Sequence, residues 1–186
     1  MRLIDDWRAD RARRRQAAAY AAAIHGEPDE AAVLWLANEG TDGDLDHARW
    51  ELRYARRALG LVVARRDALD DRTPSLIAAE LAECFARDPG IDPSKRAIAE
   101  RQFNIRLKSY REAMERRDRP VTSAERLAEV LFTFAGKVAL AGDPRVTRGA
   151  EMLAGFISQA HEALRQAFGD AALPDDVPPS AMHESR

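Results

Sequence analysis

The sequence has a single cysteine, no long apolar run and no large excess of charge of either sign, and each of these absences excludes a class of protein. Because Cys84 has no second cysteine to pair with, the fold cannot depend on an internal disulfide bond. No segment offers about 18 consecutive apolar residues, so the sequence predicts no transmembrane helix. Charged residues follow Met1 closely, where a signal peptide needs an apolar stretch, and we therefore expect a cytoplasmic location.

The charge balance argues against a general affinity for anionic partners. With 29 basic and 31 acidic residues the net charge is only -2, so long-range attraction to nucleic acid or to an anionic membrane is not expected. Nearly all basic residues are arginines, which is typical of proteins encoded by GC-rich bacterial genomes. Any contact with an anionic surface would therefore have to be local.

The alternating pattern that is typical of β-strands is missing as well, and the chain shows helical periodicity instead. Apolar and polar residues alternate over no more than a few positions, whereas glycine and proline divide the chain into segments with helical periodicity. A chain of 186 residues, 46% of them hydrophobic, is expected to bury one core. The sequence therefore predicts an all-α fold, a single-domain bundle of about six to seven helices over residues 1–168. The predicted helices span residues 3–25, 28–39, 44–72, 74–88, 93–118, 123–141 and 144–168.

Local chemistry supports several of these boundaries. Thr73, Asp92 and Asp143 each precede a proline, which is the pattern of an N-cap followed by the first helical residue. Thr122 and Glu125 have the spacing of a capping box, in which each side chain satisfies a backbone N–H at the helix start. These residues predict helix starts at about positions 74, 93, 123 and 144.

Two segments differ from an ordinary amphipathic helix. The segment 123–141 is apolar on nearly every side, which predicts a helix at the centre of the bundle. Residues 169–186 combine prolines and aspartates with few large apolar side chains, so we expect a flexible acidic tail.

The predicted helix 44–72 carries the candidate ligand site. His47 and Glu51 are four residues apart, so their side chains lie one above the other, inside the apolar arc that also holds Trp50 and Tyr54. A carboxylate beside an imidazole can orient the ring, raise its pKa or bind a ligand with it, and the aromatic side chains could line a pocket. The same pair could instead be a structural contact near the helix start.

Complete catalytic motifs are missing. The sequence has no His-Glu-x-x-His or Glu-x-x-His metal motif, no glycine-rich phosphate loop, no serine nucleophile elbow and no zinc pattern of cysteines and histidines. Cys84 lies beside Leu81 and Phe85 on its helix, which indicates a core residue rather than a nucleophile. We therefore expect no metal and no cofactor, and an enzyme is the less favoured class of protein.

Surplus amphipathic surface points to a protein partner. In the N-terminal helix a tryptophan precedes a group of arginines, and in the helix 93–118 large apolar residues recur in a four-three-four rhythm that is typical of a coiled-coil seam. That second stripe could equally be the contribution of this helix to the core. The residues expected to face a partner are Trp7, Arg8, Arg11, Phe103, Leu107, Tyr110 and Met114.

The sequence therefore favours a non-catalytic helical interaction or scaffold protein, which forms a homodimer or binds another protein. Two alternatives stay open. The first is a small-molecule-binding bundle or enzyme with a pocket near His47 and Glu51. The second is a protein that binds an anionic surface, nucleic acid or membrane, through the arginine-rich N-terminal helix.

Overall fold

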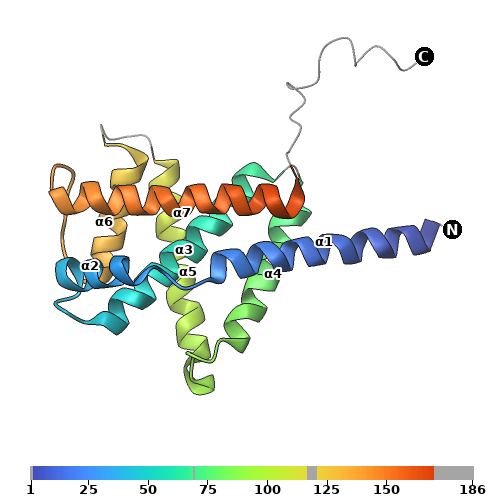
Figure 1. Ribbon diagram of the computed structural model, residues 1–186, viewed down its shortest axis with the longest axis horizontal. Coiled ribbons are helices and arrows are strands. Elements are labelled where there is room, and N and C mark those ends of the chain that lie inside the picture. The colour runs from blue at the N-terminus through green and yellow to red at the C-terminus, as the bar shows by residue number, and fades with distance from the viewer. Residues whose placement is uncertain (1, 69, 117–120, 170–186) are drawn as a thin grey trace, which may run out of the picture.

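Every described segment of the chain is helix, turn or loop, which confirms the predicted all-α fold (Figure 1). The computed structural model describes residues 2–68, 70–116 and 121–169, with side chains from Trp7 onward. Among these residues no helix is long and apolar enough to cross a membrane. The flexible tail was predicted over residues 169–186, of which residues 170–186 lie outside the described part of the chain. The helices are α1 (Arg2–His25), α2 (Glu30–Gly40), α3 (Leu45–Asp67), α4 (Arg72–Arg87), α5 (Arg96–Glu115), α6 (Ser123–Ala135) and α7 (Pro144–Phe168), with a 3-10 turn, η1 (Pro93–Lys95), before α5.

The centre of the bundle is α3, and the prediction that placed residues 123–141 there is wrong. α3 packs against all six of the other α-helices, whereas α6 packs against α2, α3, α5 and α7. Five of the eleven buried positions of α3 hold alanine or glycine, which let neighbouring helices approach closely from several sides. α3 is therefore the element on which the others are assembled.

α6 ends at Ala135, six residues before the predicted end of its segment. Gly136 has a φ of 92°, the left-handed conformation that closes a helix. The following N–H, that of Lys137, donates back to the carbonyl of Phe132 at 2.9 Å. In the connection to α7, Val138 is 83% and Leu140 is 59% exposed. The apolar character of 123–141 therefore comes from a packed helix and an exposed connection.

Three of the predicted caps are confirmed. The capping box of Thr122 and Glu125 is formed in both directions. Asp92 accepts a hydrogen bond from a backbone N–H at the start of η1, and Asp143 does the same at the start of α7. Local sequence chemistry is therefore sufficient to place these starts.

The junction between α3 and α4 differs from the prediction. α3 ends at Asp67 and α4 begins at Arg72, so Thr73 is inside the helix rather than its N-cap. The carboxylate of Asp70 accepts hydrogen bonds from the backbone N–H and the hydroxyl of Thr73, at 2.6 and 3.1 Å. An aspartate three residues earlier therefore takes the capping role that the sequence assigned to Thr73.

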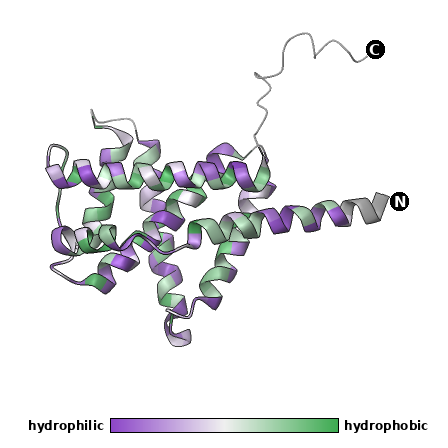
Figure 2. Ribbon diagram, in the orientation of Figure 1, coloured by the Kyte–Doolittle hydropathy of each residue, from purple (hydrophilic) through white to green (hydrophobic). Residues whose placement is uncertain are grey.

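α1 and α7 run antiparallel along the long axis of the molecule, while α5 and α6 cross that direction (Figure 1). The C-terminal half of α1 packs into the bundle, where Ala17, Tyr20 and Ala21 are fully buried. The N-terminal half continues past the bundle, and its described residues are mostly hydrophilic (Figures 1 and 2). We call residues 7–15 the arm; all of them except Asp10 are exposed.

α1 packs closely against α3 at Gly60. The hydroxyl of Tyr20 donates to the carbonyl of Gly60 at 2.8 Å. A Cβ at this position would lie 2.7, 2.9 and 2.9 Å from three carbon atoms of Ile24, which is closer than carbon atoms pack. Glycine is therefore required here for space.

We expect Gly60→Ala to lower the free energy of unfolding by about 1–3 kcal/mol, because overpacking against Ile24 outweighs the gain in helix propensity. Gly155→Ala is the matched control, since its Cβ would meet nothing within 4 Å, and it should raise stability by about 0.5–1 kcal/mol. Urea unfolding measures both variants. Stabilisation by both substitutions would contradict the tight crossing.

Candidate functional site

Glu51 is a buried carboxylate of α3, and Arg106 from α5 holds it. Glu51 is only 1% exposed. The Nε of Arg106 donates to Oε2 of Glu51 at 2.7 Å and its Nη2 donates to Oε1, so the pair is bidentate. The same guanidinium donates to the carbonyl of Gln102 at 3.2 Å. The α3–α5 contact is therefore fixed by a charge-assisted pair.

Aromatic rings surround this ion pair. The guanidinium carbon of Arg106 lies 4.9 Å from the ring centre of Tyr54 and 4.5 Å from that of Phe134. Tyr110 is fully buried, and its hydroxyl has no hydrogen-bond partner among the described residues. Burial first, and the charge of Glu51 second, raise the pKa of Tyr110 well above its ordinary value. Tyr110 therefore contributes a neutral hydroxyl to the cluster.

His47 lies at the edge of the cluster. Its Nε2 is 3.4 Å from Oε1 of Glu51 and 3.1 Å from a backbone carbonyl of α6, and its side chain is 39% exposed. Trp50 lies against Tyr54, with ring centres 5.5 Å apart, rather than against the carboxylate. The structure thus brings His47, Glu51 and Tyr54 together around Arg106. Any ligand of Glu51 would have to displace this arginine.

The apolar stripe of α5 faces the core of the molecule itself. Phe103 and Tyr110 are 7% and 0% exposed, and Leu107 and Met114 are partly buried against the core. Phe103 and Tyr110 are therefore occupied within one copy, whereas Leu107 and Met114 keep part of their surface exposed. The exposed large apolar residues of α5 are Ile98 and Ile105.

Arg57 is a second buried charge of α3, and the sequence analysis missed its burial. Arg57 is 0% exposed. Its Nη2 lies 3.3 Å from Oδ2 of Asp88 and 3.3 Å from Nε2 of His25. The guanidinium carbon is 4.6 Å from the ring centre of Phe85. Its Nε and Nη1 have no partner among the described residues. Arg57 therefore joins the C-terminal ends of α1 and α4 to α3.

His25 is the titratable member of this second cluster. Its side chain is 24% exposed, and its Nε2 lies 3.6 Å from Oδ2 of Asp88. Burial first, and then the positive charge of Arg57, lower the pKa of His25, and Asp88 opposes this shift only in part. His25 is therefore neutral at pH 7.

Three further arginines of α3, Arg49, Arg53 and Arg56, bind the connection between α1 and α2 and the residues beside it. Arg49 makes a bidentate pair with Glu30, and Arg53 binds Glu27 at 2.9 and 2.6 Å. Arg56 donates to two backbone carbonyls at the end of α1 and in the connection, at 3.2 and 3.3 Å. This arginine stripe is therefore engaged within the molecule and is not a surface for an anionic partner.

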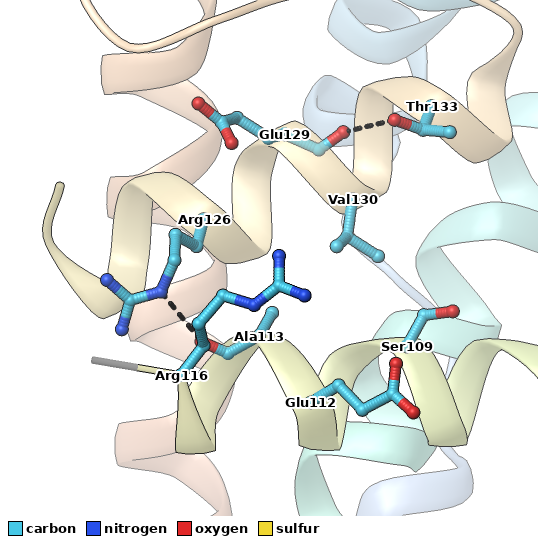
Figure 3. A pocket seen from close by; sticks show the side chains of 8 residues that line it. All are labelled: Ser109, Glu112, Ala113, Arg116, Arg126, Glu129, Val130 and Thr133. Atoms are coloured by element: carbon cyan, nitrogen blue, oxygen red, sulfur yellow. Dashed lines mark hydrogen bonds between the residues drawn. The ribbon is translucent and has the colours of Figure 1, made fainter. Parts of the chain in front are cut away.

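A cleft of about 270 Å³ lies between α5 and α6 (Figure 3). Its hydroxyl groups bind carbonyls of their own helices: Ser109 donates to Ile105 at 3.1 Å, and Thr133 donates to Glu129 at 2.8 Å. A catalytic nucleophile would instead be held by a base. The cleft therefore gives no support to an enzyme. It is lined by Ser109, Glu112, Ala113, Arg116, Arg126, Glu129, Val130 and Thr133.

Two other kinds of reactive centre also lack support. Burial raises the pKa of the Cys84 thiol, so little thiolate is present at pH 7. Within residues 2–68, 70–116 and 121–169, no group of three or more His, Cys, Asp or Glu side chains is arranged to hold a metal ion. Neither a nucleophilic thiol nor a metal centre can be assigned to these residues.

The arm carries the candidates that remain accessible. Trp7 is 60% exposed, and the guanidinium carbon of Arg11 lies 5.3 Å from its ring centre. Arg8 is exposed beside it. Asp10 pairs with Arg72 of α4, which attaches the arm to the bundle. Of the seven residues predicted to face a partner, Trp7, Arg8 and Arg11 are the exposed ones.

We expect Arg106→Met to lower the free energy of unfolding by about 3–5 kcal/mol, because it leaves the carboxylate of Glu51 buried without its partner. The double variant Arg106→Met with Glu51→Gln should recover part of that loss. Arg87→Met is the control, since Arg87 and Glu83 form an exposed pair and its loss should change stability little. Urea unfolding measures the loss of stability in Arg106→Met, in Glu51→Gln and in the double variant. A loss in the double variant equal to the sum of the two single losses would contradict the coupling of Glu51 and Arg106.

Stability should also fall in mildly acidic solution because of His25. Above its ordinary pKa of 6.5 the residue is neutral in both states, and its contribution to stability is complete. As the pH falls through 6.5, the unfolded chain binds the proton first, so the free energy of unfolding drops until the lowered pKa of the folded state is passed. His25→Gln should make this decline shallower between about pH 7 and pH 5. Parallel curves for the two proteins in urea unfolding would contradict this assignment.

No protein-family model, no curated protein and no solved structure matches the chain, so its function has to be argued from its own residues.

Proposed function

We propose that the chain is a non-catalytic interaction protein that binds a protein partner, a second copy included, through the arm. The observation that carries the proposal is the 60% exposure of Trp7 on a helix that leaves the bundle (Figure 1). Tryptophan and arginine are the residue types most enriched at binding hot spots. Trp7 and Arg11 supply both, one helical turn apart and in contact with each other.

The arm is also ready to bind without first having to fold. A helix of nine residues is marginal in water by itself, because nucleation is unfavourable. Here the same helix continues into a buried half, which provides the nucleus. A preformed helix loses less conformational entropy on binding than a disordered segment does.

The alternatives have less support in the geometry. A small-molecule site at His47 and Glu51 would require the displacement of Arg106 from a bidentate pair. Binding of an anionic surface is the second candidate, since the arm holds five arginines and one aspartate, a net charge of +4. That charge alone would not require an exposed tryptophan.

The test compares two matched double variants. Trp7→Ala with Arg11→Ala should weaken the affinity for the partner by about thirtyfold to a thousandfold, because a hot-spot residue contributes about 2 kcal/mol or more and neighbouring contributions need not add in full. Ile98→Ala with Arg101→Ala removes an exposed apolar residue and a nearby arginine from α5, and it should change the affinity less than about threefold.

A photoreactive amino acid at position 7, compared with one at position 98, identifies the partner by mass spectrometry of the cross-linked product. One defined protein cross-linked at position 7 and not at position 98 is the expected result. Equal effects of the two double variants would remove the arm from the binding surface. Salt-sensitive binding to duplex DNA or acidic vesicles without a protein partner would favour the second candidate.

A further inference from the structure

The end of the molecule opposite the arm has a surface of complementary character. The α2–α3 and α6–α7 connections meet there (Figure 1), and the Nζ of Lys137 lies 2.5 Å from Oδ1 of Asp42. Residues 42–46 and 136–142, which we call the acidic end, contain three aspartates and one lysine, a net charge of -2. The aspartates, Asp42, Asp44 and Asp46, are all exposed.

The acidic end also exposes apolar side chains. Val138 is 83%, Leu140 is 59% and Leu45 is 46% exposed. They account for three of the seven large apolar residues that are exposed in the described part of the chain. Apolar surface rimmed by charge is typical of a protein-binding site. The arm offers the reverse combination, one exposed tryptophan among five arginines.

We infer that the arm of one copy docks on the acidic end of a second copy, so that the protein associates head to tail. This inference rests on the proposed function and names its partner. Trp7 would cover Val138 and Leu140, while the arginines on its side of the helix, Arg11 and Arg15, would face Asp42 and Asp46. Those arginines follow Trp7 at intervals of four residues, so all three lie along one face of the arm.

Charge decides between this arrangement and a symmetric one. A two-fold dimer formed by two arms would place two surfaces of net charge +4 against each other, and like charges oppose such contact. Contact between the arm and the acidic end joins +4 to -2 instead. Because the two docking surfaces differ and lie at opposite ends of the molecule, each contact leaves one of each free, and association continues into chains or larger rings rather than stopping at a dimer.

The contact should be weak and sensitive to salt. One short helix and one end of a small bundle bury less than the roughly 1,600 Å² of a standard stable interface. Attraction between exposed charges is largely screened beyond about 8 Å at physiological ionic strength. Association is therefore expected at high protein concentration and low ionic strength.

The experiment uses two variants with one disabled surface each. Arg11→Glu with Arg15→Glu brings the arm to zero net charge and leaves the acidic end intact. Asp42→Asn with Asp46→Asn brings the acidic end to zero and leaves the arm intact; asparagine suits position 42, where φ is 54°. Asp44 is kept, because it caps α3. Circular dichroism verifies that both variants fold.

Sedimentation equilibrium of the full chain then gives the answer. The wild type should form species larger than dimers as its concentration rises, and added salt should dissociate them. Each variant alone should stay monomeric. An equimolar mixture should form dimers and nothing larger, because one intact arm meets one intact acidic end.

Other outcomes overturn the inference in different ways. If the acidic-end variant associates like the wild type, the arm docks on a surface other than the acidic end, and the proposed function is unaffected. Association that stops at a symmetric dimer would exclude the head-to-tail mode. A wild type that stays monomeric at every concentration would exclude a second copy as partner. If that monomer cross-links to another protein through position 7, the proposed function survives; if it binds only acidic vesicles or duplex DNA, the proposed function fails as well.

Discussion

Because α3 is surrounded by all the other helices, each polar side chain on its buried faces must find a partner inside the molecule. Two of these side chains carry opposite charges. Glu51 is met by Arg106 from α5, and Arg57 is met by Asp88 after α4, with His25 at the end of α1. Such pairs need not add much net stability, but a misplaced helix would leave a charge buried without its partner. The register of α1, α4 and α5 on α3 thus depends on charge, whereas the alanines of α3 allow the close approach.

The sequence was sufficient for the fold class and for the elements whose ends depend on local chemistry. The capping box of Thr122 and Glu125 and the caps at Asp92 and Asp143 involve residues two or three apart, so they depend little on distant parts of the chain. The end of α6 was visible as well, because Gly136 is a typical C-cap residue. This helix end was missed because the apolar residues after Gly136 continue the helical pattern, although they are exposed. Hydrophobicity alone does not distinguish a buried face from a binding surface.

The interior charges were only half predictable. Glu51 stood out as a carboxylate inside an apolar arc, and that was a valid signal of an internal partner. Arg57 gave a weaker signal, since its helical position lies at the edge of the apolar face of Tyr54 and Leu61, beside the polar stripe of arginines. The partners could not be found in this way. Arg106 and Asp88 are 55 and 31 residues away in sequence, and only the packing of the helices brings them close.

Net charge was the most misleading of the sequence observations, and the structure explains why. A value of -2 argues against long-range attraction of the whole molecule to charged partners, but it is an average over groups with very different environments. Four arginines of α3, at positions 49, 53, 56 and 57, are matched by carboxylates or backbone carbonyls within the same molecule, so they contribute little field outside it. The arginines of the arm have a single aspartate among them and project past the bundle. A nearly neutral chain can therefore carry a strongly polarised surface, and it is the pairing of the interior charges that leaves the arm and the acidic end as opposite poles of the molecule.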